Sequence, residues 1–564
     1  MKLLPDFSEE TRVAQAPRAR LLTAAGSVLL IVSAFLSWSF DDRVLDDISI
    51  RFYPASLQLF ALFLGVTGLV LSLVELGVLS RLRRWLDATL GLRALGAWTL
   101  GFAVLSLVAI ATETAGLVNV NEGGWVALVG ALLLFVGATL LPQRELDDIT
   151  RVKLPGWAEI LVIVVSLAVA LFAAAYALEH EDPWVFVLFL VTVAGIIVAL
   201  ARAGFFTWFG SVASRHRHVL TLSSFAVAFL FPFALGGSQA TMSIAAAVLV
   251  FAATAIGLNI VVGLAGLLDL GYIAFLGAGA YVSAMLSASA FATIDWTPPF
   301  LVTMLIGGCV SAILGLIIGS PTLRVSGDYL AIVTLAFGEI FRLAMFNLDG
   351  NNGPDLTNGP NGIPAIPHLN MFGFDFGAEH TIAGVTLGAD SNYYFLLLVL
   401  LSFIILVFTR LNNSRIGRGW VAIREDERAA EAMGVNTFGL KLLAFAGGAF
   451  LAGLAGTIKA HRDVAVSPDQ YIFLESAFLL SAVVLGGMGT VAGVLVGAVI
   501  LKLMPEKLRF FSEYRLLIFG LLLIVMMRFR PEGLVASKRR QLEFHDDDEE
   551  LATATTMDEL EAAK

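Results

Sequence analysis

The sequence predicts an all-α polytopic membrane protein with about 16 transmembrane helices. The chain has 564 residues and is 58% hydrophobic, with a mean hydropathy of +0.84. Soluble domains average about 45–50% apolar residues, so a soluble protein of this composition could not bury its apolar surface. Apolar runs of about 18 residues or more recur along the whole chain. Each is long enough to cross a hydrocarbon core of roughly 30 Å as a helix, which predicts residence in a lipid bilayer.

The apolar runs fall into two series separated by the basic connector Ser214–His218. Six spans are expected near 21–40, 54–80, 93–114, 124–141, 157–178 and 184–206. The second series is expected near 219–237, 242–264, 270–290, 299–320, 329–347, 393–411, 440–460, 474–503 and 515–530. We therefore predict an N-terminal hydrophobic extension over 1–215, a second domain over 216–540 and a disordered tail over 541–564. That tail carries a net charge of −8, as is typical of a solvated segment.

Basic residues in short loops mark the cytoplasmic side of a membrane protein. They predict cytoplasmic N- and C-termini and place Arg415–Arg428 inside. This orientation fails if 474–503 is one span, because the basic C-terminal segment then lies outside. A break at the glycines Gly486, Gly487 and Gly489 replaces that span with two short helices and restores the orientation. The prediction is six helices, then a core of about ten with a broken glycine-rich segment, packed closely through motifs such as AGGAFLAGLAG at 446–456.

Few ionisable residues lie inside the predicted spans, where such residues are functional candidates. Glu339 and Arg342 share a helix face and can pair, Asp269 is expected at a membrane boundary, and Glu475 opens the 474–503 segment. Each is a candidate pathway residue or a structural charge. The scarcity argues against an ion-coupled transporter, so either the substrate passes without ion coupling or another subunit supplies the energy.

No sequence motif indicates catalysis, a metal site, a bound cofactor, a nucleotide site or nucleic-acid binding. The single cysteine, Cys309, allows neither a disulfide nor a cysteine metal site within one chain. GSPTLRVSGDY does not match the phosphate-binding pattern GxxxxGK[ST]. The loop Asn347–Asn392 is rich in Asn, Gly and Pro, which predicts a series of turns. It is either a plain surface loop or a docking rim for an extracytoplasmic partner.

A compact charged segment, Arg415–Asn436, contains eight charged residues between two apolar runs. Helical spacing over Ala422–Met433 places Arg424, Glu427, Arg428 and Glu431 on one stripe, with two opposite-charge pairs at i,i+3. The neighbouring stripe of Asp426, Ala429, Ala430 and Met433 is small and mostly apolar, and Gly434 follows as a helix C-cap. The stripe suits either a groove on a partner protein or a solvated loop helix. The residues alone leave both interpretations open.

The second half of the chain resembles the LivM-type membrane permeases of ABC importers for branched-chain amino acids. The similar stretches occur in family order over about Thr241–Gly533. They are GLNIVVGLAGLLDLGYIAFLGAGAY (257–281), LRVSGDYLAIVTLAFGEIFRL (323–343), NGPNGI (358–363), GRGWVAIREDERAAEAMGVN (417–436), KLLAFAGGAFLAGLAGTI (441–458) and SPDQYIFLESAFLLSAVVLGGMGTVAGVLVGA (467–498). Residues 1–215 and the acidic tail match no motif of this family.

The resemblance implies a permease in a prokaryotic inner membrane that works by alternating access. Its implied partners are a LivH-like permease, two cytoplasmic ABC ATPases that bind ATP and Mg²⁺, and a periplasmic or extracytoplasmic amino-acid-binding protein. It also implies that the binding protein largely sets specificity, with little substrate-specific chemistry in the channel. The implied ATPase-coupling residues are Arg424, Glu425, Asp426, Glu427, Arg428, Ala429, Ala430 and Gly434.

Three alternatives remain beside this interpretation. A urea or short-amide permease of the same superfamily differs in its substrate. An ion-coupled secondary transporter would take up substrate without ATPase subunits. A membrane-embedded enzyme would need His, Asp or Glu clustered at one membrane face, a pattern that the sequence does not show.

Overall fold

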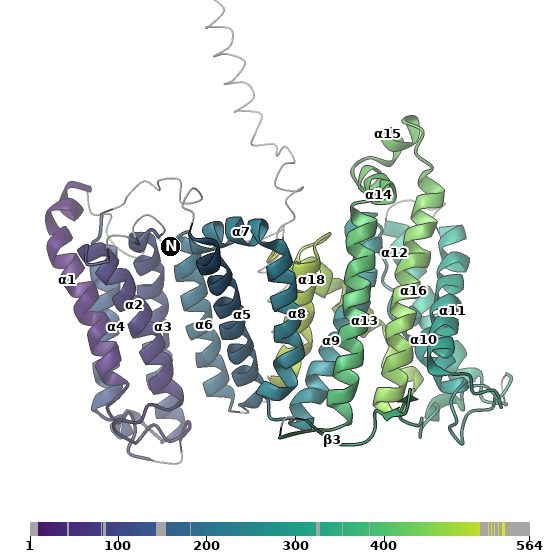
Figure 1. Cartoon of the computed structure of the whole chain (residues 1–564), viewed down its shortest axis with the longest axis horizontal. Coiled ribbons are helices and arrows are strands. Elements are labelled where there is room, and N and C mark those ends of the chain that lie inside the picture. Colours follow the sequence, from purple (N-terminus) through teal and green to yellow (C-terminus); the bar gives the residue numbers. More distant parts are fainter. Residues whose placement is uncertain are drawn as a thin grey trace, which may run out of the picture. The chain divides into compact units, whose positions relative to one another are not determined.

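Helices form most of the computed structural model shown in Figure 1. The structure describes residues 9–507 apart from 42–43, 80–81, 83–85, 143–153, 181, 323–327, 352 and 383, together with 517, 520–521, 524, 528 and 533–535. Within these residues, 13 helices are long and apolar enough to cross a membrane, and two more apolar helices are shorter. They occupy the places of all the predicted spans except 515–530, which lies largely outside the described residues, as does the acidic tail. The predicted class, an all-α polytopic membrane protein, is confirmed.

Two compact units divide the chain, Met1–Ala234 and Leu235–Lys564, here called unit 1 and unit 2. The predicted boundary near residue 215 falls between α7 (Phe205–Arg215) and α8 (Arg217–Ala234). Helix α8 packs against α5 (Gly156–Glu179), so it lies within unit 1.

Unit 1 is a helical bundle with a large apolar core and a smaller separate cluster of Ile163, Trp208 and Val212. Its remaining elements are α1 (Glu9–Ser33), α2 (Ser56–Leu76), α3 (Ala88–Glu113), the 3₁₀ turn η2 (Leu117–Asn119), α4 (Glu122–Thr139) and α6 (Pro183–Arg202). Helix α1 packs on α2 and α4, and α3 packs on α4 and α6. Asp87 and Asp182 accept the free amides at the first turns of α3 and α6, as N-cap residues do. Trp38, Phe60 and Phe102 fill the core.

Two buried carboxylates in unit 1 are paired. Glu75 lies 3.6 Å from Arg20, and Glu159 lies 3.1 Å from Arg215 and 2.9 Å from His216. Breaking a buried pair leaves an uncompensated charge, so these contacts hold α1 to α2 and the α7–α8 connection to α5.

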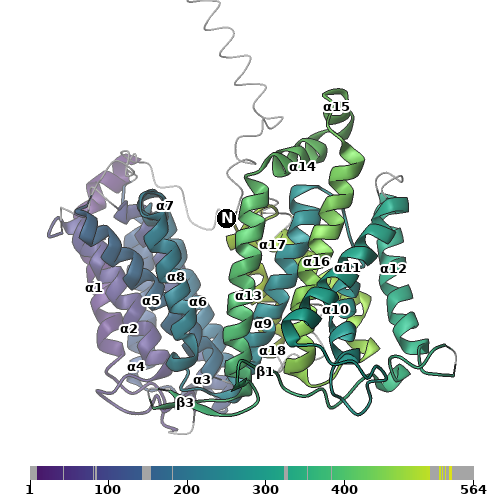
Figure 2. The same cartoon turned by 45° about the vertical axis from the view of Figure 1, so that its right-hand side comes forward.

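Unit 2 begins with α9 (Gln239–Asn259), which ends in a π-helical turn, η4 (Ile260–Leu264). The helices that follow are α10 (Ile273–Met285), α11 (Phe300–Thr322), α12 (Asp328–Asn347), α13 (Ala389–Asn412), α14 (Arg415–Glu425), α15 (Glu427–Ala432), α16 (Thr437–Asp463), α17 (Phe473–Gly486) and α18 (Val491–Lys507). Figures 1 and 2 show α14 and α15 at one end of this unit and the strands of the long loop at its other end. We call these the α14 end and the strand end.

The loop between α12 and α13 is built from turns and two small hairpins, as its composition predicts. The elements are η5 (Gly359–Asn361), β1 (Asn370–Met371) paired with β2 (Phe374–Asp375), and β3 (His380–Ile382) paired with β4 (Val385–Leu387). Ile363 forms an isolated bridge with Val466, which precedes η6 (Pro468–Tyr471). The loop is therefore fastened to the strand end of α16.

Helix α16 lies at the centre of unit 2 and packs against α9, α10 and α11. Glycines bring these backbones into direct contact. A Cβ atom at Gly456 would overlap the carbonyl oxygen of Leu276 in α10, and one at Gly279 would overlap the carbonyl oxygen of Gly453. Small residues at such crossings give the close packing by which helices associate in lipid.

We expect Gly456→Ala to lower the stability of the chain by roughly 1–3 kcal/mol, the usual effect of overpacking, because its methyl group has no space against α10. Gly447→Ala is the matched control, since it makes the same change in α16 at a position with no neighbouring atom within 4 Å. The measurement is the thermal unfolding midpoint of the full chain in detergent. Equal midpoints for the two variants would contradict the proposed backbone contact.

Candidate functional site

Helices α14 and α15 form the element that the sequence analysis assigned to ATPase coupling. Ser414 caps α14 by accepting the amides of Ile416 and Gly417. Trp420 is buried, and its Nε1 donates a hydrogen bond of 2.7 Å to the carbonyl oxygen of Leu440 in α16. Helix α14 is therefore fixed along one face, while the segment Glu425–Ala429 is exposed.

The single helix expected over Ala422–Met433 is wrong. Asp426 has extended backbone angles (φ −154°, ψ 108°) and ends α14. Its carboxylate accepts the amides of Arg428 at 2.9 Å and Ala429 at 3.0 Å, so it is the N-cap of α15. Aspartate is a favoured N-cap residue, and this capping preference overrides continuous helix propensity.

The break also changes the expected ion pairs. Arg424 pairs with Glu425 at 2.7 Å, and Glu427 pairs with Lys441 of α16 at 2.5 Å. The Glu427–Lys441 pair fastens α15 to the start of α16. Spacing along one helix could not identify Lys441, because it lies on another helix.

The surface of α15 combines charge with exposed apolar atoms. Ala430 is buried, whereas Ala429 is exposed and Met433 is 84% exposed. Gly434 follows with φ +81°, in the left-handed region that favours glycine, and thereby turns the chain toward α16. The end of α15 thus presents the exposed side chain of Met433 near the exposed charges of Glu425 and Arg428.

Arg424 connects α14 to the π turn of α9. Its Nη1 donates a hydrogen bond of 2.9 Å to the carbonyl oxygen of Gly263. A π turn leaves the regular ladder of backbone hydrogen bonds, so a side chain can reach its carbonyl groups. A displacement of α14 would therefore act directly on the end of α9.

The same end of α9 holds the break between α17 and α18. The Gly489 amide donates to Asn259 Oδ1 at 2.8 Å, and Asn259 Nδ2 donates to the Thr490 carbonyl oxygen at 3.3 Å. Gly487 and Gly489 have φ values of +119° and +79°, so the turn uses backbone conformations that other residues rarely adopt. Asn259 is fully buried.

A returning segment satisfies the free carbonyl groups at the end of α17. Leu534 and Val535 donate their amides to the carbonyl oxygens of Leu485 and Gly486, both at 2.9 Å. Irregular backbone at membrane depth is tolerated where protein satisfies its polar groups, as here. The chain therefore breaks within 474–503, where the sequence analysis placed Gly486, Gly487 and Gly489.

Asp269 lies in the connection between the π turn and α10, outside the membrane-spanning helices. It is buried, and its Oδ1 accepts the Gly271 amide at 2.9 Å, which fixes the turn before α10. Burial raises the pKa of this carboxyl to about 7, because the charged form loses its hydration. Asp269 shapes the start of α10.

Glu339 and Arg342 lie together on α12. Arg342 Nη2 is 2.6 Å from Glu339 Oε1, and its Nη1 is 3.4 Å from Asp469 in η6. The pair joins α12 to the strand end of unit 2. Glu475 lies elsewhere, at the start of α17.

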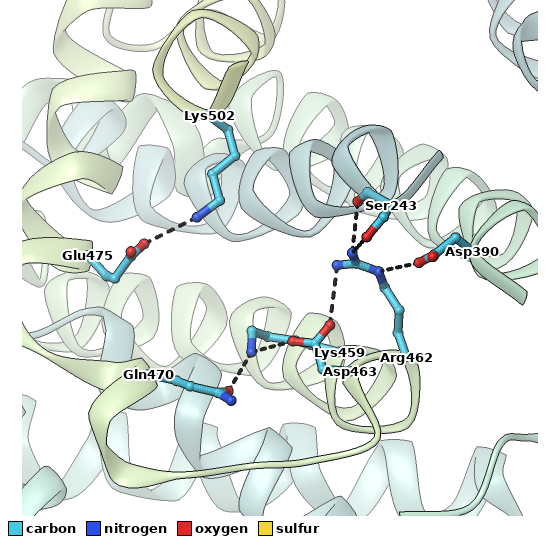
Figure 3. Close-up of polar contacts among 8 residues, drawn as sticks. All are labelled: Ser243, Asp390, Lys459, Arg462, Asp463, Gln470, Glu475 and Lys502. Carbon is cyan, nitrogen blue, oxygen red and sulfur yellow. Dashed lines mark hydrogen bonds and ion pairs between the residues drawn. The ribbon is translucent and has the colours of Figure 1, made fainter. Parts of the chain in front are cut away.

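A charged cavity at the strand end contains Glu475 and four other charged residues drawn in Figure 3. We use this name for the cavity of about 360 Å³ between α9, α10, α16, η6, α17 and α18. Its charged and polar lining residues are Lys459, Arg462, Asp463, Gln470, Glu475 and Lys502. Its apolar wall includes Val250, Phe251, Ile273, Leu276 and Leu479. Asp390 and Ser243 extend the polar network behind Arg462.

Of this cluster, only Glu475 was a candidate from the sequence. Lys459, Arg462 and Asp463 lie in the last turns of α16, and Lys502 lies in an apolar stretch of α18. These charges lie toward helix ends, beside the few ionisable residues expected inside the spans. The run KAHRD carried a signal, because Lys459 and Asp463 are spaced i,i+4, but the partners on α17 and α18 come together only through tertiary packing. Within the described part of the chain, no group of three or more His, Cys, Asp or Glu side chains could hold a metal ion.

Comparison with known proteins gives consistent matches to one family of permeases. The family model described as "Branched-chain amino acid transport system / permease component" matches residues 240–527. The high-affinity branched-chain amino acid transport system permease protein LivM of Salmonella typhimurium and that of Escherichia coli are each 40% identical over 345 residues, covering 59% of this chain and 78% of the relative. The permease protein LivH of Escherichia coli is 30% identical over 128 residues, covering 22% of this chain and 41% of the relative. No solved structure matches this chain.

We expect Asn259→Leu to increase amide hydrogen exchange at Gly489 by about tenfold or more, since loss of this acceptor leaves the amide unsatisfied. Thr254→Val is the matched control, because Thr254 is also buried in α9 but its hydroxyl bonds only to Val250 of its own helix among the contacts described. Hydrogen exchange with mass spectrometry on the full chain measures both. Unchanged exchange over 487–490 in Asn259→Leu would show that Asn259 does not hold the break.

Proposed function

We propose that this chain, which belongs to the family of branched-chain amino acid transport permease components, carries a branched-chain amino acid across the membrane by alternating access. It is a permease subunit of an ABC importer and a multi-pass membrane protein. The finer proposal concerns how the work of ATP reaches it. We assign that role to α14 and α15.

The observation that carries this proposal is the continuous series of contacts from α14 to the break in α17–α18. Arg424 binds the π turn of α9, and Asn259, immediately before that turn, binds Gly489 and Thr490. A force on α14 therefore reaches the glycine-rich turn between α17 and α18.

The surface of α15 supports docking in a groove of an ATPase. It presents Ala429 and Met433 beside charged side chains, which is the arrangement of a helix that lies in a partner's groove. Two cytoplasmic ATPases would hold the ATP and Mg²⁺, and a LivH-like permease would complete the pathway. An extracytoplasmic amino-acid-binding protein would deliver substrate at the strand end. In the proposed assembly α14, α15 and both chain termini would lie in the cytoplasm of a prokaryotic cell.

The proposal differs from an ion-coupled transporter in a measurable way. Uptake by the assembled complex should require ATP and persist when the proton and sodium gradients are collapsed. The exposed hairpins β1–β2 and β3–β4 lie at the end where the binding protein would dock, which favours the partner interpretation of the long loop.

We expect Glu427→Lys to reduce leucine uptake by about tenfold, the effect of roughly 1.4 kcal/mol, while ATP hydrolysis continues. The new lysine would face Lys441 and release α15 from α16. Gly434→Pro should act in the same direction, because proline cannot adopt φ +81°. Uptake and hydrolysis are measured together in proteoliposomes that contain the co-expressed subunits.

The double variant Glu427→Lys/Lys441→Glu is the control, since it restores the ion pair in reverse and should recover uptake. Wild-type uptake in both Glu427→Lys and Gly434→Pro would refute the coupling role of α15. Membrane insertion should be unchanged in all these variants.

We also expect that deleting residues 1–234 leaves co-purification with the ATPases intact, because α14, α15 and their contacts all lie in unit 2. A deletion of 1–210 is the informative comparison, since it retains α8 without its packing partner α5 and should be less stable. Co-purification is measured by affinity capture of the permease. Loss of the ATPases from the 1–234 deletion would show that unit 1 is part of the docking structure.

A further inference from the structure

We propose that the charged cavity is an amino-acid-binding site within the permease, in which Lys502 binds the α-carboxylate and Glu475 binds the α-ammonium group. This inference rests on the proposed function, since it takes an amino acid as the substrate. It goes beyond that function because it assigns recognition chemistry to this chain, where the resemblance implied little.

The charges of the cavity are balanced. The lining cations Lys459, Arg462 and Lys502 face the lining anions Asp463 and Glu475, and Asp390, behind Arg462, supplies the third negative charge (Figure 3). A zwitterion carries both charges and no net charge, so it can enter without leaving either charge of the site unpaired. A ligand with only one charge would upset this balance.

The hydrogen bonds identify which charges are available to a ligand. Arg462 is held by Asp390 at 3.2 Å, by the Ser243 carbonyl oxygen at 2.8 Å and by Asp463 at 3.4 Å. Lys459 donates to Asp463 at 2.7 Å and to Gln470 at 2.8 Å. Arg462 and Lys459 are therefore already engaged by protein groups, which leaves Lys502 as the cation available to a ligand.

Lys502 and Glu475 form the loosest of the ion pairs drawn in Figure 3. Their nitrogen and oxygen atoms are 3.5 Å apart, longer than the roughly 2.7–2.9 Å of a charge-assisted hydrogen bond. Both side chains are about one-third exposed, at 36% and 32%. A ligand that supplies a carboxylate to one and an ammonium to the other can replace this weak contact with two stronger ones.

The apolar wall gives the site its side-chain preference. Val250, Phe251, Leu276 and Leu479 line the cavity beside the Lys502–Glu475 pair, and the Lys502 ammonium lies 5.4 Å from the centre of the Phe251 ring. The volume of about 360 Å³ lies within the roughly 300–1,000 Å³ of small-molecule sites. An aliphatic side chain would bury its surface against this wall. A small polar amide such as acetamide would gain neither this burial nor the two ionic contacts.

The position of the pair links the site to the glycine break between α17 and α18. Glu475 lies at the start of α17 and Lys502 near the end of α18, the two helices that join at the glycine break. A zwitterion between them would bridge these helices at the strand end, while Asn259 holds their junction at the α14 end. Substrate and coupling helix would then act on opposite ends of one hairpin.

The test is equilibrium binding of radiolabelled L-leucine to the full chain in lipid nanodiscs, with no ATPase and no nucleotide. The competitors are 4-methylpentanoate, which lacks the ammonium group, 3-methylbutylamine, which lacks the carboxylate, and acetamide. We expect each to compete about tenfold or more weakly than unlabelled leucine, as for loss of one charge-assisted contact. Equal competition by either single-charge analogue, or no saturable leucine binding, would overturn the proposal.

Two variants assign the contacts separately. Glu475→Gln should abolish the preference for leucine over 4-methylpentanoate but keep the preference for leucine over 3-methylbutylamine. Lys502→Met should abolish the preference over 3-methylbutylamine but keep the preference over 4-methylpentanoate. A purely structural role for this pair would weaken all ligands alike and leave both preferences unchanged, which would refute the assignment. Glu122→Gln, which removes an ion pair with Arg51 in unit 1, is the matched control and should bind as wild type. The wild-type competition decides the question even where a variant does not fold.

The experiment also separates this inference from the proposed function. Because the assay contains no ATPase, a failure of α15 to couple hydrolysis to transport leaves its result unaffected. ATP-driven leucine uptake by a complex whose permease shows no charge preference would overturn the binding site alone.

Discussion

A lipid bilayer offers no hydrogen-bonding partner to backbone groups that lie outside a helix. In unit 2 the side chain of Asn259 supplies such a partner at the break between α17 and α18. Its carbonyl oxygen accepts the Gly489 amide and its amide group donates to Thr490. With the returning amides of Leu534 and Val535, it allows a glycine turn to exist at membrane depth. The proposed coupling path and the proposed binding site both depend on this turn. The coupling path ends at the turn, and the binding site lies between α17 and α18, the two helices that the turn joins.

Those parts of the fold could be predicted that depend on a local sequence pattern, or on the number of spans between basic loops. Apolar runs located the spans, and the distribution of basic residues required a break near Gly486–Thr490, where α17 does end. The position of the coupling segment was also apparent from its charge. Its internal break was not, although Asp426 followed by helix-forming residues is an N-cap pattern that competed with the helical stripe.

The cavity could not be predicted in the same way, because its members come from separate helices. Lys502 lies alone in the apolar run of α18, and Arg462 closes a span, where a snorkelling interfacial cation is the ordinary interpretation. Only packing brings them toward Glu475 and Asp390. Likewise, the basic connector near residue 215 stood out in the sequence, while the packing of α8 on α5, which assigns that helix to unit 1, leaves no local signature.

The glycine contacts of α16 limit how this permease can move. Because its backbone touches that of α10 at Gly456 and Gly279, a sliding or rotating motion between these helices would drive main-chain atoms into one another. We therefore expect α16 and α10 to stay packed together as one rigid pair. In the α17–α18 hairpin glycine serves a different purpose, since the positive φ values of Gly487 and Gly489 let the chain reverse its direction between two packed helices.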